Sequence, residues 1–172
     1  MSTIATIESA RAFERHRDEV YRWAFRLVGR HHEALDVAQD VFVKWIEASR
    51  SESVIDQPRA WLRRVTINRA IDVVRARTTA IAAAIDSAEP RSMEDASGAI
   101  ERAELRRQIT LAMEGLTDMQ RGVLIAKTFD DLSFAQVAEE MNIAIPTVKT
   151  HYLRAVSAVR DRLAHHRRME SI

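Results

Sequence analysis

With 172 residues, 47% of them hydrophobic and 30% charged, the chain is long enough for one ordinary domain or two small ones with packed cores. Four glycines and three prolines leave few turns, which favours helices, and zero cysteines exclude disulfides and thiolate zinc sites. No apolar run approaches the roughly 18 residues that span a bilayer, and the first residues do not form a secretion signal, so we expect no membrane insertion and a cytoplasmic location.

The formal net charge of +1 conceals strong segregation along the chain. Residues 33–47 and 86–104 are acidic blocks, whereas residues 58–77 and 145–168 are basic blocks. Alternating blocks of this kind suggest different partners for different surfaces, although each block alone also fits an ordinary solvated helix face.

The first half of the chain predicts three helices. Their apolar spacing places them at residues 9–28, 33–48 and 58–77. Gly29 ends the first helix, Pro58 suits the first turn of the third, and residues 80–85 could extend it. The segment 49–57 is polar and is expected to be irregular. The residues predicted to form the apolar faces of the first two helices are Phe13, Val20, Trp23, Ala24, Leu27, Ala34, Ala38, Val41, Phe42 and Trp45.

The second half predicts four helices and follows a linker rich in small and polar residues. The domain bounds are 9–78 for the first domain, 79–99 for the linker and 100–168 for the second domain. Thr117 with Gln120, and Ser133 with Gln136, are spaced as capping boxes at the starts of two of these helices. Since no convincing strand occurs, the predicted fold class is all-α, with two small helical domains.

Residues 133–160 form a helix-turn-helix candidate. Ala138 allows two helices to cross closely, Asn142 tolerates the left-handed backbone of the turn, and Ile143 can fill the core between the helices. Pro146 then opens a long helix that reaches about residue 165. The alternative is a plain helical hairpin within a bundle.

The long final helix has two expected faces. The residues expected to be buried are Val148, Tyr152, Ala155, Val156, Val159 and Leu163. The residues expected to face outward are Thr147, Thr150, His151 and Arg154. Hydroxyl, imidazole and guanidinium groups near a helix N-terminus suit the reading of base edges in a major groove, and Lys149 and Arg160 lie to the side, where phosphates would run.

Two blocks of the sequence resemble one family. Leu116–Arg121, Leu132–Glu139 and Thr147–His151 are similar to region 4 of the sigma-70 family, in its extracytoplasmic-function subgroup. Residues 34–45 resemble region 2.2, and residues 58–72 resemble regions 2.3 and 2.4. The family usually has Gly at the turn and Ser as a cap, where this chain has Asn142 and Ala144, and His151 stands where Arg is common. The resemblance therefore predicts how the helix docks on DNA better than it predicts which promoter sequence the protein prefers.

The resemblance implies a sigma factor that brings core RNA polymerase to promoter DNA. It implies that the second helix docks on the coiled coil of the polymerase β′ clamp, and it includes the β flap among the polymerase contacts. The residues expected to bind polymerase are Asp36, Gln39, Asp40 and Val43. Asp36 and Asp40 are like charges four residues apart, which slightly destabilise an isolated helix and make more sense opposite a basic partner. The alternative is an ordinary solvated acidic face.

The third helix is the expected DNA-opening element. Its stripe of an aromatic ring, arginines and an amide can hold unstacked bases and single-strand phosphates. The residues expected to contact the −10 element are Trp61, Arg64, Asn68 and Arg75. A rival interpretation places Trp61 in the core, because tryptophan is usually mostly buried. By the same resemblance, the residues expected to bind the −35 element are Thr147, Lys149, Thr150, His151 and Arg154.

Two other functions stay open at this stage: a stand-alone helix-turn-helix regulator, and a helical interaction module that does not bind DNA. We expect no enzyme, because no nucleophile–base pair, glycine-rich phosphate loop or ligand cluster stands out. No cofactor is expected, and the adjacent pairs His31–His32 and His165–His166 lack the spacing of metal ligands. An anti-sigma factor is a further partner that the resemblance admits. The sequence does not indicate which genes the protein controls or which signal induces it.

Overall fold

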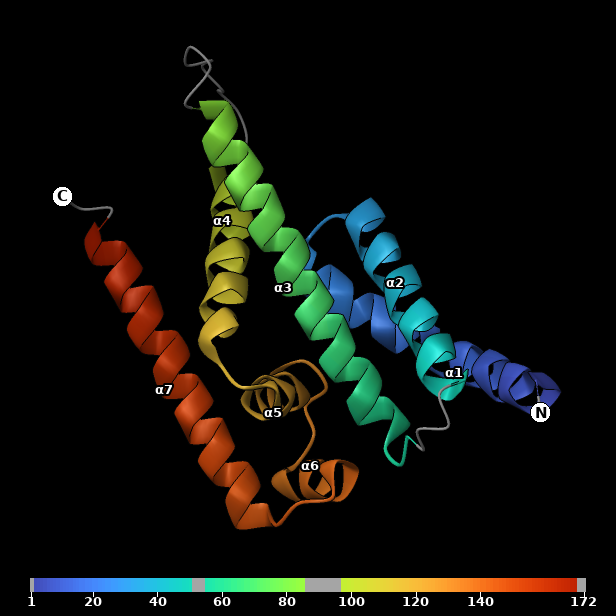
Figure 1. The fold of residues 1–172 in the computed structure, drawn as a ribbon. Coiled ribbons are helices and arrows are strands. Elements are labelled where there is room, and N and C mark those ends of the chain that lie inside the picture. Colours follow the sequence, from blue (N-terminus) through green and yellow to red (C-terminus); the bar gives the residue numbers. More distant parts are fainter. Residues whose placement is uncertain (1, 51–54, 86–96, 170–172) are drawn as a thin grey trace.

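The computed structural model describes residues 2–50, 55–85 and 97–169, and in these ranges every regular element is a helix (Figure 1). The elements are α1 (Ser2–Val28), α2 (His31–Arg50), α3 (Pro58–Ile85), α4 (Ser97–Ala112), the 3-10 turn η1 (Met113–Gly115), α5 (Asp118–Thr128), α6 (Phe134–Met141) and α7 (Ile145–Met169). The all-α prediction is confirmed, with three helices in the first half and four in the second. None of the described helices is long and apolar enough to cross a membrane.

The helix boundaries follow local chemistry. Gly29 ends α1 in the left-handed region, at φ +77°, where glycine carries no steric penalty. The expectation that residues 49–57 are irregular is wrong at its start, because α2 continues through Arg50 and the Ser49 hydroxyl donates to the Trp45 carbonyl at 2.8 Å. The expected extension of the third helix is confirmed, since α3 runs to Ile85.

The segment assigned to the linker is partly helical. Residues 79–85 belong to α3 and residues 97–99 belong to α4, while residues 86–96 lie outside the described residues.

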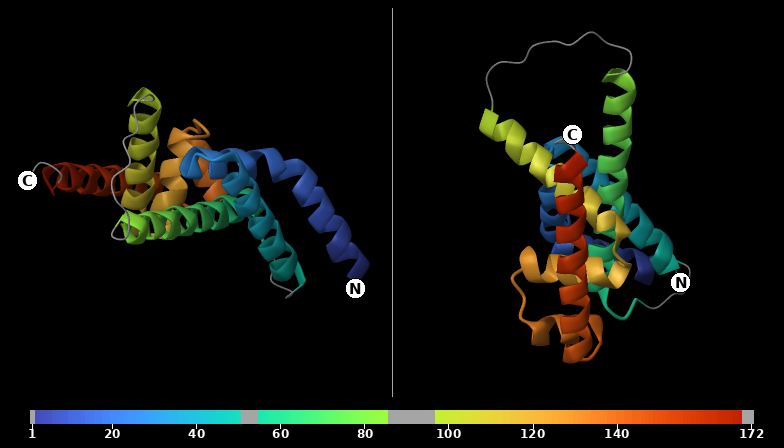
Figure 2. Two further views of the ribbon diagram at one scale, coloured as in Figure 1. Left: turned by 90° about the horizontal axis from the view of Figure 1, so that it is seen from above. Right: turned by 90° about the vertical axis from the view of Figure 1, so that its left-hand side faces the viewer.

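Helix α3 runs through the middle of the molecule. Helices α1 and α2 lie on one side of it, and α4, α5 and α6 lie on the other, with α7 at the edge farthest from α1 and α2 (Figures 1 and 2). The predicted apolar faces are buried, with Trp23 1% exposed and Ala34 and Val41 fully buried. Phe13 departs from this pattern, because it is 44% exposed and rests edge-on against Phe42.

The two halves of the chain share one hydrophobic core. Leu116, Leu124 and Ile125 of the second half belong to the same buried cluster as Trp23 and Leu62 of the first half. The Thr110 hydroxyl of α4 also donates to the Leu27 carbonyl of α1 at 3.1 Å. Sequence patterns predicted two lobes and left their relative placement open; in this structure the lobes are packed together.

The helix-turn-helix has a second, smaller core of its own. Its buried members are Val123, Ala126, Val137, Ala138 and Val148. Both predicted capping boxes are present, each with reciprocal bonds between the N-cap hydroxyl and the glutamine three residues later. They satisfy backbone donors that the first helical turn leaves unpaired.

The turn between α6 and α7 adopts the predicted left-handed conformation. Asn142 has φ 52° and ψ 49°, and its backbone N–H donates to the carbonyls of Ala138 and Glu139. The Ile143 N–H donates to the Ala138 carbonyl at 3.0 Å. These bonds close the C-terminus of α6 and set the direction in which α7 leaves the turn.

Replacing Asn142 tests the requirement for this backbone. Asn142→Val should lower the free energy of unfolding by about 1–2 kcal/mol, because a branched side chain clashes with the backbone in the left-handed region. Asn142→Gly, the matched control, should unfold at or slightly above the wild-type urea concentration, because glycine adopts this conformation freely. An equal loss in both variants would show instead that the asparagine side chain matters.

Candidate nucleic-acid interface

The outward face of α7 presents the predicted base-reading side chains. Thr147, Lys149, Thr150 and Arg154 are exposed, and the Thr150 hydroxyl donates to the Pro146 carbonyl at 2.9 Å. The Lys149 ammonium lies 6.0 Å from the ring centroid of Phe134, to the side of this face. The structure therefore brings Thr147, Thr150 and Arg154 together on one solvent-facing surface near the start of α7, with Lys149 at its side.

His151 differs from the other predicted readers because it is only partly exposed. Its Nδ1 atom is buried and has no hydrogen-bond partner among the described residues.

The apolar face of α7 is narrower than predicted. Val148 and Ala155 are fully buried, but Val156 is 39% exposed, so its assignment to the core is wrong. Val156 lies one turn from Leu153, which is 68% exposed and which the sequence pattern did not single out. An exposed apolar strip therefore lies beside the polar reading face, because α5 and α6 cover only part of the helix.

The predicted polymerase-binding side chains lie on one surface of α2. Asp36, Gln39 and Val43 are exposed, and Val43 is exposed over 54% of its surface. Leu35 and Ile46, which sequence reasoning missed, extend this surface with 43% and 37% exposure. Their spacing of eight and three residues from Val43 gives a helical stripe, so the exposed surface is apolar with acidic residues along one side.

Asp40 has an ionic partner within the chain. Its carboxylate lies 2.6 Å from the Arg69 Nε of α3, and both side chains are partly exposed. An ion pair this exposed is weak and exchanges readily with water or another partner. Asp40 is thus accessible at the edge of the α2 surface, and it is paired with Arg69.

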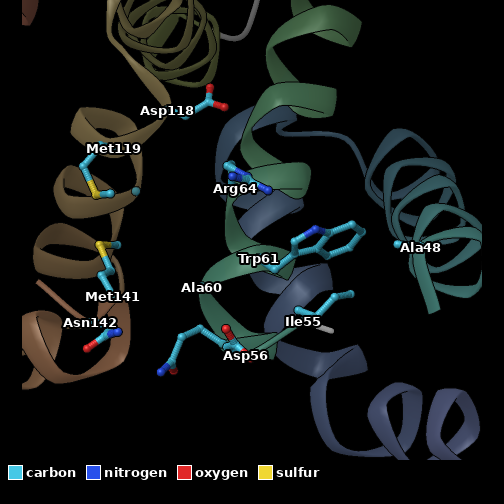
Figure 3. Close-up of a pocket in the computed structure, with 12 residues that line it drawn as sticks. Ala48, Ile55, Asp56, Ala60, Trp61, Arg64, Asp118, Met119, Met141 and Asn142 are labelled. Atoms are coloured by element: carbon cyan, nitrogen blue, oxygen red, sulfur yellow. The ribbon is translucent and has the colours of Figure 1, made fainter. Parts of the chain in front are cut away.

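The predicted −10 side chains of α3 divide between the core and a cleft. Trp61 is half-buried and packs edge-on against Trp45, with ring centroids 5.5 Å apart, so it is both a core residue and a wall of the cleft. The cleft encloses about 590 Å³. Figure 3 shows Trp61 and Arg64 on one side of it and Met119, Met141 and Asp118 on the other.

Asn68 and Arg75 are hydrogen-bonded to carboxylates, from the second half and from α3 itself. The Asn68 amide donates to Asp118 at 3.2 Å, and the Arg75 guanidinium donates to Glu114 at 2.8 Å and to Asp72 at 2.8 Å. The hydrogen bond from Arg121, reinforced by Asn68 and by the nearby charge of Arg64, lowers the pKa of Asp118. Asp118 is therefore a carboxylate anion at neutral pH and faces the basic side of α3.

A buried ionic cluster, which sequence reasoning did not find, lies on the other side of α3. We call it the Arg63 cluster, and its members are Glu19, Trp23, Arg59, Arg63, Asp130 and Glu140. Arg63 is fully buried, donates to Asp130 at 2.7 Å and to Glu140, and lies 5.0 Å from the ring centroid of Trp23. The Trp23 indole N–H donates to the other Asp130 oxygen at 2.8 Å.

Arg59 extends the Arg63 cluster to α1. It donates to Glu19 at 2.9 Å and also pairs with Glu140. Burial alone would raise the pKa of Glu19, but hydrogen bonds from His16 and Arg59 outweigh that effect and lower it. The arginines at positions 59 and 63 appeared in the sequence only as part of a basic block, and no local pattern could show which carboxylates they would meet.

The described side chains do not suggest metal chemistry. No group of three or more histidine, aspartate and glutamate side chains that could hold a metal ion occurs within residues 2–50, 55–85 and 97–169. His31 lies with its Nδ1 2.9 Å from the Tyr21 hydroxyl.

The chain matches two family models in the order that the sequence blocks suggested. Residues 12–79 match sigma-70 region 2, and residues 106–159 match sigma-70 region 4. It is 30% identical to the ECF RNA polymerase sigma factor SigW of Bacillus subtilis, over 86% of this chain and 84% of the relative. It is 26% identical to SigE of Mycolicibacterium smegmatis, over 88% of this chain and 60% of the relative.

Among solved structures, the chain is similar to the sigma factor RpoE in complex with the anti-sigma factor NepR, from Bartonella quintana. It covers 90% of this chain and 96% of the other, with 20% sequence identity and a TM-score of 0.48.

Proposed function

Since the chain belongs to the sigma-70 family, in its extracytoplasmic-function subgroup, we propose that it binds core RNA polymerase through α2 and promoter DNA through α3 and α7. It is a transcription initiation factor and not an enzyme. The main observation that supports this proposal is the exposed polar face of α7. This helix belongs to a helix-turn-helix in which α6 ends in a left-handed turn. This is the geometry that places a helix N-terminus in a major groove.

The proposed polymerase contact is the exposed stripe on α2. Val43 would be buried against the β′ clamp, with Asp36, Gln39 and Asp40 facing its basic groups. An exposed apolar side chain beside like charges is unfavourable in water and becomes favourable when a partner covers it. The β flap, reached from the second half, is the second polymerase contact we propose.

The proposed −10 contact is the cleft side of α3. Arg64, Asn68 and Arg75 provide charge and hydrogen bonds for single-strand phosphates and bases, and Trp61 provides a partly exposed aromatic surface at the cleft. Binding of unpaired bases stabilises the melted state over the duplex, so that the binding energy itself favours opening. The −35 element is bound as duplex by Thr147, Lys149, Thr150, His151 and Arg154, with Lys149 on a phosphate.

We also propose domain bounds, a cellular location and a regulatory partner for this chain. We propose domains at 9–78 and 100–168, which contain most of both family matches. A cytoplasmic location is proposed because a sigma factor acts at promoters on the chromosome. An anti-sigma factor is a proposed regulator, which membership of the family admits.

Transcription with purified core polymerase is the direct test of function. Run-off transcripts from genomic fragments should require this protein, and footprints at −35 and −10 should appear only when core polymerase is present. A palindromic footprint without polymerase would favour the stand-alone regulator. Promoter capture that does not weaken with salt would favour an interaction module that does not bind DNA.

Val43→Asp should weaken binding to core polymerase by about tenfold or more, because a buried carboxylate replaces an apolar contact. Ile81→Asp is the matched control: Ile81 is 47% exposed on α3, outside the α2 stripe, and its replacement should leave affinity unchanged. Titration of labelled protein with core polymerase measures both. Equal losses in the two variants would contradict the α2 contact.

Arg154→Ala and His151→Ala should weaken capture of a −35 duplex and relax base preference, each by about 1–3 kcal/mol, because both side chains lie on the reading face. Lys149→Ala should weaken binding equally for all sequences, because a phosphate contact carries no base information. Competition with single-base variants of the −35 element measures preference. An unchanged preference after Arg154→Ala would reject the assigned face.

Arg64→Ala and Asn68→Ala should reduce open complexes relative to closed complexes by about tenfold, because they remove contacts made only with parted strands. The measurement starts from assembled holoenzyme and uses permanganate reactivity of promoter thymines. Arg15→Ala, which removes an exposed arginine from α1, is the control for charge and should leave the ratio unchanged. A loss of closed complexes alone would contradict the assignment.

A further inference from the structure

Two methionine side chains lie on the wall of the cleft that α5 and α6 form. Met119 belongs to α5 and is 36% exposed, and Met141 is the last residue of α6 and is partly buried. Both line the cleft of about 590 Å³, and Figure 3 shows them one above the other on this wall. Small molecules that enter the cleft from solvent therefore reach two thioethers.

Thioethers are the sulfur groups that this chain offers to an oxidant, because it has six methionines and no cysteine. Met113 also belongs to the second half, and it is only 1% exposed. A small oxidant in solution reaches an exposed thioether faster than a buried one. We therefore expect Met119 and Met141 to react before Met113.

The methyl end of Met141 is packed against the backbone of α5. Gly122 is buried, and a Cβ atom added to it would lie 3.0 Å from the Met141 Cε atom. The missing side chain at position 122 thus leaves the room that the thioether end occupies. An oxygen atom added to the Met141 sulfur would need space next to this contact, in an interior that is already close-packed.

Met141 also connects the cleft with the core of the helix-turn-helix. It packs against the small buried cluster whose members include Val137 and Val148. It directly precedes Asn142, whose left-handed backbone closes α6 and sets the direction in which α7 leaves the turn. A displaced Met141 side chain would therefore shift α6 relative to the helix that presents the −35 contacts.

Oxidation by a peroxide changes the thioether in the way that this contact tolerates least. The sulfur lone pair attacks one oxygen of hydrogen peroxide, the O–O bond breaks, and the other oxygen takes the proton of the transferred oxygen and leaves as water. The sulfur loses two electrons, and the product is a polar, chiral sulfoxide in place of a flexible apolar group. A buried sulfoxide oxygen would lose its hydrogen bonds to water.

We propose that Met141 is an oxidation site for peroxides, and that its sulfoxide weakens binding of the −35 element by disturbing the packing of α6 against α5. The inference rests on the proposed function, because that function assigns α7 to the −35 element. Met119 is the exposed neighbour whose sulfoxide stays hydrated and leaves this packing intact. The exposed stripe of α2 lies outside the helix-turn-helix, so binding to core polymerase is unchanged.

The first measurement maps the modification on the free protein. Wild type is treated with hydrogen peroxide, and peptide mass spectrometry follows the gain of one oxygen atom at each methionine. Met119 and Met141 should be oxidised at least about tenfold faster than Met113, because the cleft admits the oxidant and the core does not. Oxidation of Met141 at the same rate as Met113 would overturn the proposal.

The second measurement is protection of the −35 element by holoenzyme assembled from oxidised protein and untreated core polymerase. Peroxide should weaken this protection about tenfold in wild type and less than about twofold in Met141→Leu, which keeps an apolar side chain of similar size. Met119→Leu is the matched control and should stay as sensitive as wild type. Treatment of oxidised wild type with methionine sulfoxide reductases should restore protection. Equal sensitivity of wild type and Met141→Leu, insensitivity of Met119→Leu, or a loss that the reductases do not reverse would each contradict the proposal.

A third measurement needs no oxidant. Met141→Gln places a polar side chain of similar length at this position and should weaken −35 protection about tenfold, whereas Met119→Gln should leave it unchanged. Equal protection by these two variants would count against the role of Met141. Untreated wild-type holoenzyme is scored separately: absence of promoter protection rejects the proposed function, whereas normal protection that peroxide does not change rejects only the oxidation site.

Discussion

The arrangement of the two halves depends on one buried guanidinium. Arg63 is fully buried between Trp23, Asp130 and Glu140, and these partners come from α1, the segment after α5, and α6. An arginine without these partners would be expensive to bury, so its position and theirs are mutually dependent. The aromatic ring, the two carboxylates and the apolar residues around them bring both halves into one core.

The basic block on α3 meets carboxylates of the second half, among them Asp118, Asp130 and Glu140, which lie outside the acidic blocks of the sequence. The basic residues of α3 are suited to DNA, and the acidic residues of the second half are suited to the same basic residues. In this structure the basic residues of α3 pair with acidic residues of the second half, while Val43 on α2 and Arg154 on α7 are exposed.

Local signals in the sequence predicted most of the secondary structure and the turn. Capping boxes, Gly29, Pro58 and Asn142 act over a few residues, so their consequences are visible in the chain itself. The exposed faces of α2 and α7 also followed from helical spacing. The burial of Val156 was predicted wrongly because spacing gives the direction of a side chain and not the width of the covering helices. The Arg63 cluster was missed because its members are separated by up to 121 positions, from Glu19 to Glu140, and no periodicity links them.

The shared core has a consequence for recombination between relatives. A chimera that joined residues 1–85 to the second half of another sigma factor would keep Arg63 but inherit foreign residues at positions 130 and 140. Unless the new second half also supplied two carboxylates, the buried guanidinium of Arg63 would have no negatively charged partner there. We therefore expect such a chimera to pack its halves as this protein does only where both carboxylates accompany the arginine.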